Sequence, residues 1–230
     1  MQIEANGITI NYQVDGPDGA PWLVLSNSLA TNLAMWEDQA REFKRAFRVL
    51  RYDQRGHGES GAPLGRYSFE LLIADAVALM DGLGIKRAHF AGLSMGGATA
   101  LGLAQRHPER LDRVIVCDSA CQSTPASTLQ WEERIAIAEK QGMEALVEPT
   151  IARWFPPEAI KANPAHLDKV REMIRSTPVK GFVGCAAALA DHDYASGAPS
   201  VQRPVLFLVG EKDGLVPAAM RKLTIERYRA

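Results

Sequence analysis

A serine placed between two glycines is the pattern in this chain that most directly indicates chemistry. In Gly92-Leu93-Ser94-Met95-Gly96, a glycine lies two residues before and two residues after the serine. An apolar run at residues 88–91 precedes the pattern, and a helix-like stretch at residues 97–106 follows it. This order predicts a strand, a sharp turn and a helix, with the Ser94 hydroxyl exposed above a sheet. Ser94 is therefore a candidate nucleophile, provided that a base and an oxyanion hole converge on it.

A nucleophilic serine needs hydrogen-bond donors for the negative charge that develops on the attacked oxygen. The sharp turn predicts the backbone N–H of Met95 as one donor. A second donor is expected in the loop after an apolar strand at residues 22–25, where the sequence reads Ser26-Asn27-Ser28-Leu29. We predict that the Leu29 amide is this second donor; the alternative is a plain connecting loop.

A carboxylate follows the last apolar run of the chain. Residues 204–209 are mostly apolar and lead into Gly210-Glu211-Lys212-Asp213-Gly214. Asp213 is then expected at the C-terminal edge of a strand, where open α/β sheets place their functional groups. A carboxylate there can orient a histidine and stabilise the imidazolium formed when Ser94 loses its proton. We predict Asp213 as the catalytic acid; the alternative is an ordinary turn aspartate.

The segments around these residues alternate between strand and helix patterns. Ser68 is placed to cap a helix in which Leu72, Leu79 and Leu83 share one face. Strands are expected at residues 8–14, 22–25, 49–53, 88–91, 113–117 and 204–209. Alternation of this kind predicts a mostly parallel sheet with right-handed crossovers, in the α/β class.

The pattern changes between residues 122 and 197, where helical stretches follow one another without a strand. Prolines are expected to separate these helices, at Pro149, Pro156, Pro157, Pro164 and Pro178. The sequence therefore predicts an α/β core at residues 1–121 and 198–230, with residues 122–197 forming a helical cap over the catalytic face.

Bulk composition excludes several classes of partner. The chain of 230 residues has 26 Lys and Arg against 27 Asp and Glu, so neither nucleic acid nor an anionic membrane is indicated as a partner. Its N-terminus lacks a signal-peptide pattern, and its apolar runs are too short to cross a bilayer. Cys117, Cys121 and Cys185 form an odd set without metal-ligand spacing, typical of free thiols in a reducing cytoplasm. No metal or cofactor is expected, and the sequence gives no indication of oligomeric state.

Three segments together resemble the α/β-hydrolase family: the serine turn at residues 92–96, Asp53-Gln54-Arg55-Gly56-His57-Gly58-Glu59-Ser60, and the turn at residues 210–214. Within that family, softer similarities point to the 3-oxoadipate enol-lactonases of aromatic-compound degradation. These similarities lie in Leu25-Ser26-Asn27-Ser28-Leu29 with Met35-Trp36, in Arg153-Trp154-Phe155, and in Gly184-Cys185-Ala186-Ala187-Ala188-Leu189.

The resemblance implies a specific reaction in the β-ketoadipate pathway. Ser94 would attack the carbonyl of a five-membered enol-lactone, with the oxyanion held by the Leu29 and Met95 amides, and the product would be 3-oxoadipate. Because such a substrate carries a free carboxylate, a cation is expected in or under the cap. The resemblance makes Arg134 and Arg153 candidates for this cation, with Trp131 and Trp154 as apolar walls; the alternative for each is a solvated helix face or cap packing.

The chain departs from the family in its histidine. The family order is Ser, Asp and then His, on a loop after one further strand, but none of the 17 residues after Asp213 is a histidine. A helix, a strand and that loop would need about 25 residues or more. The last strand and helix and the base are therefore expected to be missing, so that the chain binds ligand but turns it over poorly.

None of the five histidines is assigned as a substitute base: His57, His89, His107, His166 and His192. His57 is expected at the same sheet edge as Ser94, but the matching histidine of the family is part of the scaffold. The expected partner is a small-molecule lactone or ester. Two alternatives to the enol-lactonase function stay open. One is a different carboxylesterase or perhydrolase of the same fold, and the other is a non-catalytic ligand-binding remnant. Ser94 argues against haloalkane dehalogenases, which attack with an aspartate.

Overall fold

The computed structural model describes residues 1–162, 164–211 and 213, and in this part of the chain seven strands form one sheet. Their order is β1-β2-β4-β3-β5-β6-β7. The strands are β1 (Gln2–Ala5), β2 (Ile8–Asp15), β3 (Trp22–Ser26), β4 (Arg48–Tyr52), β5 (Ala88–Leu93), β6 (Leu111–Cys117) and β7 (Val205–Leu208). Strands β3 to β7 pair in parallel, whereas β1 and β2 are antiparallel. The predicted α/β class and mostly parallel sheet are confirmed.

The strand β1 was not predicted from the sequence. It pairs with β2 through a hairpin whose two turn residues, Asn6 and Gly7, have φ values of 48° and 76°. Positive φ at both positions is the geometry for which Asn-Gly is favoured in tight hairpins, because the turn then matches the twist of the strands. The Asn-Gly pair before residues 8–14 was the available signal for this hairpin.

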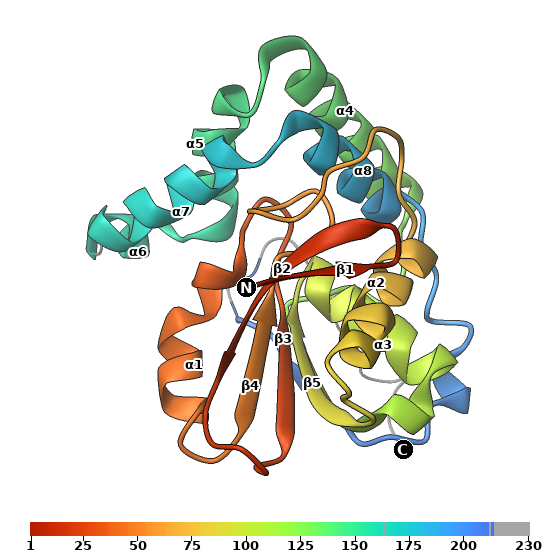
Figure 1. Cartoon of the computed structure of the whole chain (residues 1–230). Helices are drawn as coiled ribbons and strands as arrows, with labels where there is room; N and C mark the ends of the chain where they lie inside the picture. The colour runs from red at the N-terminus through yellow and green to blue at the C-terminus, as the bar shows by residue number, and fades with distance from the viewer. Residues whose placement is uncertain (163, 212, 214–230) are drawn as a thin grey trace.

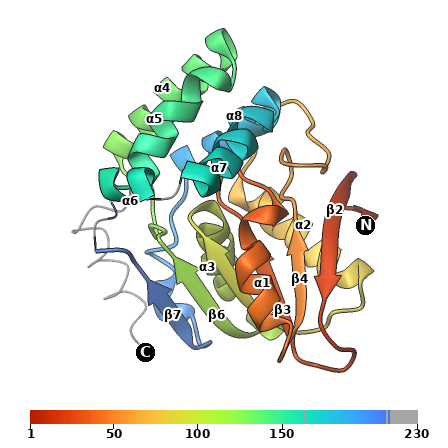
Figure 2. The same ribbon diagram turned by 90° about the vertical axis from the view of Figure 1, so that its left-hand side faces the viewer.

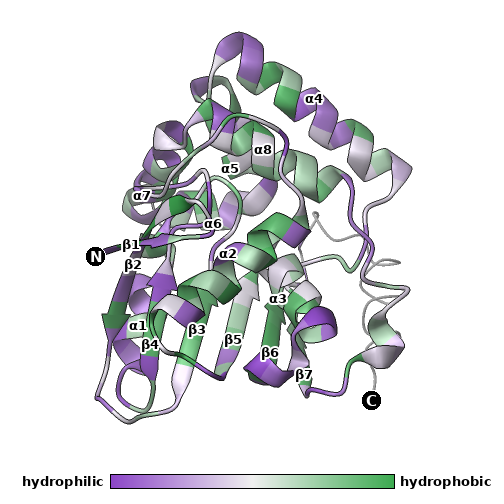
Figure 3. Ribbon diagram, turned by 45° about the vertical axis from the view of Figure 1, so that its right-hand side comes forward, coloured by the Kyte–Doolittle hydropathy of each residue, from purple (hydrophilic) through white to green (hydrophobic). Residues whose placement is uncertain are grey.

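Helices cover both faces of the sheet (Figures 1 and 2). Helix α1 (Glu37–Phe43) lies on one face, and α2 (Phe69–Gly82) and α3 (Met95–Arg106) lie on the other. Ser68 caps α2 as predicted, accepting a hydrogen bond from the Leu71 amide at 3.4 Å. Figure 3 shows apolar residues along α2, α3 and the strands beneath them, where the larger hydrophobic core lies. A smaller core under α1 includes Leu25 and Trp36.

A second group of helices lies at one end of the sheet, above the first layers (Figure 1). These are α4 (Pro125–Gln141), α5 (Glu144–Trp154), α6 (Pro157–Ala162), α7 (Pro164–Ser176) and α8 (Val179–Ala190). The helical character expected for residues 122–197 agrees with these elements, whereas the division of the chain into core and cap domains stays a prediction.

The expectation that Pro149 separates two helices is wrong, because Pro149 lies inside α5. A proline removes one backbone hydrogen bond in the middle of a helix and strains it. Helix α5 nevertheless buries Leu146, Val147 and Ile151. Packing of this face against α4 and α7 accounts for the helix continuing through the proline.

Two further expectations concern thiols and membranes. Within the described part of the chain the three cysteines form no disulfide, and Cys121 and Cys185 are buried whereas Cys117 is partly buried. Among the described helices, none combines the length and apolar character needed to cross a bilayer. The expected absence of the last strand and helix concerns residues 214–230, which lie outside the described part of the chain.

Candidate active site

Ser94 occupies a sharp turn between β5 and α3, as the sequence predicts. Its backbone has φ of 53° and ψ of −109°, a combination that residues other than glycine rarely adopt. A Cβ atom at Gly92 would lie 2.0 Å from the carbonyl oxygen of Gly96, and one at Gly96 would lie 2.1 Å from that of Ser26. The two glycines therefore allow the first turn of α3 to approach the ends of β3 and β5 closely.

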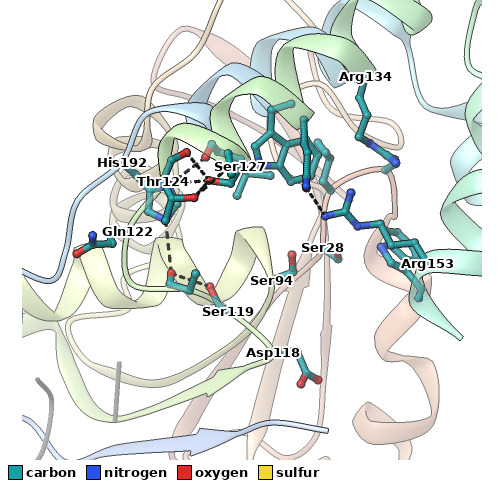
Figure 4. Close-up of a pocket in the computed structure, with 18 of the residues that line it drawn as sticks. Ser28, Ser94, Asp118, Ser119, Gln122, Thr124, Ser127, Arg134, Arg153 and His192 are labelled. Carbon is teal, nitrogen blue, oxygen red and sulfur yellow. Dashed lines mark hydrogen bonds between the residues drawn. The ribbon is translucent and has the colours of Figure 1, made fainter. Parts of the chain in front are cut away.

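A cavity of about 340 Å³ lies between this turn and the helices α4, α5 and α8. Its floor includes Ser94 and Ser28, whereas Arg134 and Arg153 lie on one side and His192 on the other (Figure 4). The remaining lining residues are Leu29, Ala30, Asp118, Ser119, Ala120, Gln122, Thr124, Ala126, Ser127, Gln130, Trp131, Trp154, Phe182 and Leu189. The volume suits a small organic molecule.

The two amides predicted for the oxyanion hole have no acceptor among the residues that the structure describes. Leu29 and Met95 are both buried, and within the described part of the chain neither backbone N–H donates a hydrogen bond. The neighbouring amides do have acceptors: that of Ser28 contacts the Met35 sulfur at 3.4 Å, and that of Ala30 the His57 Nε2 at 2.9 Å. Buried backbone donors are rarely left unpaired, so this pair suits an oxyanion. Their assignment as the oxyanion hole stays a prediction.

Two aspartates lie at the ends of neighbouring strands, and sequence reasoning identified only Asp213. Its amide donates to the Gly210 carbonyl at 3.1 Å in the loop after β7. Asp118 follows β6, with φ of 42°; its Oδ1 accepts the Gly210 N–H at 2.8 Å. Asp118 lines the cavity with Ser94, whereas Asp213 is not among the lining residues. Asp118 thus joins the end of β6 to the loop that carries Asp213, whose role as catalytic acid stays a prediction.

Arg134 is a largely buried cation in the cavity wall. Its Nη2 donates to the Thr150 hydroxyl at 2.7 Å, and its guanidinium lies 5.7 Å from the Trp131 ring centre and 6.0 Å from that of Phe182. Its Nε is buried without a partner among the described residues. Burial lowers the pKa of Arg134 to about 10, and the charge of Arg153 contributes to this shift.

Arg153 lines the same cavity and donates from Nη2 to the Gln130 side chain at 3.1 Å. Burial lowers its pKa, against an opposing effect from Asp213. The structure therefore brings together the four residues predicted for substrate binding: Trp131, Arg134, Arg153 and Trp154. Their role in binding stays a prediction.

His57 has both ring nitrogens engaged by backbone groups. Its Nε2 accepts the Ala30 N–H, and its Nδ1 lies 3.1 Å from the Arg55 carbonyl and therefore donates to it. Burial lowers the pKa of the imidazole to about 4. The ring is neutral at neutral pH, in agreement with the expected scaffold role.

His192 was expected in cap packing, yet it also lines the cavity. Its Nδ1 lies 3.2 Å from the Leu189 carbonyl and its Nε2 3.4 Å from that of Ala120, and its ring packs on Phe69. Burial lowers its pKa. Within the described part of the chain, which includes all five histidines, none is hydrogen-bonded to Ser94.

Comparison with known proteins identifies the family. The family model described as alpha/beta hydrolase fold matches residues 21–225. The chain belongs to the α/β-hydrolase fold family. Among its curated relatives, 3-oxoadipate enol-lactonase 2 of Acinetobacter baylyi is 35% identical over 94% of this chain and 80% of the relative. A putative carbamate hydrolase, RutD of Stutzerimonas stutzeri, is 31% identical over 90% of this chain and 80% of the relative.

Solved structures give the same family. The enol-lactonase from Burkholderia xenovorans LB400 superposes with a TM-score of 0.95 at 38% identity, covering 99% of this chain and 87% of that one. A hydrolase from Pseudomonas aeruginosa PA01 superposes with a TM-score of 0.94 at 34% identity, covering 99% and 86%. The predicted resemblance to α/β-hydrolases and enol-lactonases is confirmed.

The close approach at Gly96 yields a stability prediction for this α/β-hydrolase. Replacing Gly96 by alanine forces a Cβ against the Ser26 carbonyl and should lower the free energy of unfolding by about 3 kcal/mol. Gly84→Ala, just after α2, is the control: its position has positive φ but open space, so only a backbone penalty of about 1 kcal/mol is expected. Urea unfolding measures both variants. Equal losses of unfolding free energy in the two variants would show that the contact with β3 does not add to the backbone penalty.

The buried imidazole of His57 yields a pH prediction. Because its folded pKa is about 4 against an ordinary 6.5, the unfolded chain takes up the proton first as the pH falls. His57 therefore makes the folded state progressively less stable between pH 6.5 and pH 4, by at most about 1.4 kcal/mol per pH unit.

Urea unfolding at pH 7 and pH 5 tests this attribution with His57→Gln. The wild type should lose about 2 kcal/mol more than the variant on acidification. His107→Gln, at a partly exposed position beside Glu109, should behave as the wild type. A loss in His57→Gln as large as that of the wild type would assign the acid sensitivity to other groups.

Proposed function

We propose that this α/β-hydrolase is a serine hydrolase for a small lactone or ester that carries a free carboxylate, with 3-oxoadipate enol-lactone as the substrate. The supporting observation is that one cavity joins three features: the strained Ser94, the Leu29 amide without an acceptor among the described residues, and the largely buried Arg134. The enol-lactonase relatives favour the lactone over other esters.

The reaction begins at the lactone carbonyl. Ser94 Oγ forms a bond to the carbonyl carbon while its proton passes to a base, and the Leu29 and Met95 amides hold the oxyanion. The ring C–O bond then breaks, and its electron pair leaves on an enolate oxygen. Because the enolate is protonated and relaxes to a ketone, it is a better leaving group than an alkoxide. Water then cleaves the acyl-enzyme ester to give 3-oxoadipate and free Ser94.

Arginines in the cavity wall would hold the substrate carboxylate. Arg134 is largely buried, and its buried Nε has no hydrogen-bond partner among the described residues. A guanidinium in such an environment gains strongly from an anion, since a charge-assisted hydrogen bond replaces a desolvated donor. Arg153 adds positive charge from the neighbouring helix, while Trp131 and Trp154 line the apolar part of the cavity.

The reaction also needs a general base, and we assign none of the five histidines to this role. His57 is bonded to backbone groups through both nitrogens, and His192 faces two carbonyl oxygens. With Asp213 as the acid and no histidine hydrogen-bonded to Ser94 in the described part of the chain, we expect these 230 residues to bind ligand and to turn it over slowly. This observation also keeps a non-catalytic ligand-binding role as the second candidate function.

Ser94 reactivity distinguishes the two candidates. Purified protein should release p-nitrophenol from p-nitrophenyl acetate at a low rate that Ser94→Ala lowers further, because the Ser94 hydroxyl is the group that accepts the acetyl group. Ser119→Ala, which removes another hydroxyl from the cavity wall, should leave that rate unchanged. Identical rates for Ser94→Ala and wild type would exclude the hydrolase. A rate typical of an ordinary esterase would instead refute the expected slow turnover.

Carboxylate recognition is tested separately by binding. Titration with 3-oxoadipate, followed by fluorescence of the cavity tryptophans, should show affinity that Arg134→Gln weakens about 30-fold, the loss expected for a hydrogen bond to a charged group. Arg175→Gln is the control, because this cap arginine is paired with Glu144 on the surface and should not affect binding. The dimethyl ester of the same ligand should bind both arginine variants equally. Unchanged affinity in Arg134→Gln would remove Arg134 from the site.

A further inference from the structure

The loop that carries the Leu29 amide is held by hydrogen bonds on both sides of that residue. On one side, the Ser28 N–H contacts the Met35 sulfur, and the Ser28 carbonyl accepts the Thr31 hydroxyl at 2.8 Å. On the other side, the Ala30 N–H donates to His57 Nε2 at 2.9 Å. Since the peptide planes before and after Leu29 are both anchored, its N–H direction is fixed by these contacts and not by an acceptor of its own.

Ala30 needs this anchor more than an ordinary loop residue does. Its φ of 59° lies in the left-handed region, which costs an alanine about 1 kcal/mol or more. Ala30 is also almost fully buried. A strained, buried residue keeps its conformation only when its surroundings determine it, and the bond to His57 is the contact that fixes its amide.

His57 is itself held so that it can only accept at Nε2. Its Nδ1 donates to the Arg55 carbonyl, which also accepts a hydrogen bond from Cys185 Sγ at 3.3 Å. Cys185 lies on α8, and the backbone of Gly56 packs directly on Gly181 of the same helix. The tautomer with the proton on Nδ1 is therefore fixed, and the Nε2 lone pair faces the Ala30 N–H.

We propose that His57 is a positioning residue of the oxyanion hole: through its Nε2···H–N bond to Ala30 it aims the Leu29 amide at the reacting oxygen. The proposal rests on the proposed function, which assigns that amide to the oxyanion. It gives His57 a part in the reaction without contact with substrate, and it makes the hole depend on a neutral imidazole.

Protonation of His57 would put a second donor against the Ala30 N–H and release the loop. The groups facing the ring are Asp53, whose charge favours the proton, and the Cys185 thiol on α8. The Arg55 side chain is directed away into a buried pair with Asp75. Burial has the largest effect on the pKa of His57 and lowers it to about 4, so the ring stays neutral above that pH.

Two substitutions at His57 test the proposal. His57→Gln keeps an acceptor near the Nε2 position, whereas His57→Leu removes it at similar volume. The measured quantity is the Ser94-dependent release of p-nitrophenol from p-nitrophenyl acetate, taken as the rate above that of Ser94→Ala. His57→Leu should lower this rate about 100-fold, the usual effect of losing an oxyanion donor. Its affinity for 3-oxoadipate should change less than about 3-fold, and His57→Gln should restore most of the rate.

The acid limb of the rate is a second readout, measured only at pH values at which thermal unfolding shows the wild type and each variant to be folded. The wild-type rate should fall relative to that of His57→Gln as the pH approaches 4. His89→Leu, at the opposite end of β5 and packed on Phe47, is the matched control and should leave the rate unchanged. Thermal unfolding of each variant identifies any loss of folded protein.

The outcomes separate the two proposals. A wild type no faster than Ser94→Ala overturns the proposed function and this inference with it. A reactive wild type with His57→Leu as fast as His89→Leu overturns this inference alone. Equal slowing of His57→Leu and His57→Gln, with both folded, also overturns it, because the acceptor for Ala30 would then be irrelevant.

Discussion

The contact between the first turn of α3 and the ends of β3 and β5 is the constraint on which the site depends. Without side chains at Gly92 and Gly96, α3 begins almost in contact with the backbone of Ser26. This approach holds Ser94 in its strained conformation and leaves the Met95 amide at the start of a helix, where it has no intrahelical partner. It also sets β3 directly beside Ser94, so the loop that follows β3 supplies the Leu29 amide to the same cavity.

The second constraint is electrostatic. Arg134 and Arg153 share a cavity wall with aromatic rings, and burial lowers the pKa of both. Two desolvated guanidinium groups repel each other when the cavity is empty. A bound anion offsets both their desolvation and their repulsion. This charge balance supports the proposed carboxylate-bearing ligand. The apolar surfaces of Trp131 and Trp154 suit the carbon skeleton of a small acid.

Within the described part of the chain, His57 is held as a structural group and is not placed to act as a base. His57 is fully buried and its two nitrogens are committed to Ala30 and Arg55. A neutral, fixed imidazole makes a reliable acceptor for a strained loop, but it has no free lone pair for the Ser94 proton. Its location beside the loop that carries Leu29 is the basis of the proposed positioning role, which needs no contact with the substrate.

The sequence by itself determined the elements that depend on local pattern. The glycine spacing around Ser94, the short apolar runs and the Ser68 cap specified the turn, the parallel strands and α2, because steric fit and periodicity act over a few residues. Only the tertiary structure decided what depends on distant partners. Pro149 stays within α5 because of packing, Asp118 gains its link to Gly210 at the ends of β6 and β7, and Arg134 becomes largely buried only when α4 and α5 meet. Burial and charge pairing are set by neighbours far apart in the chain, so no local pattern encodes them.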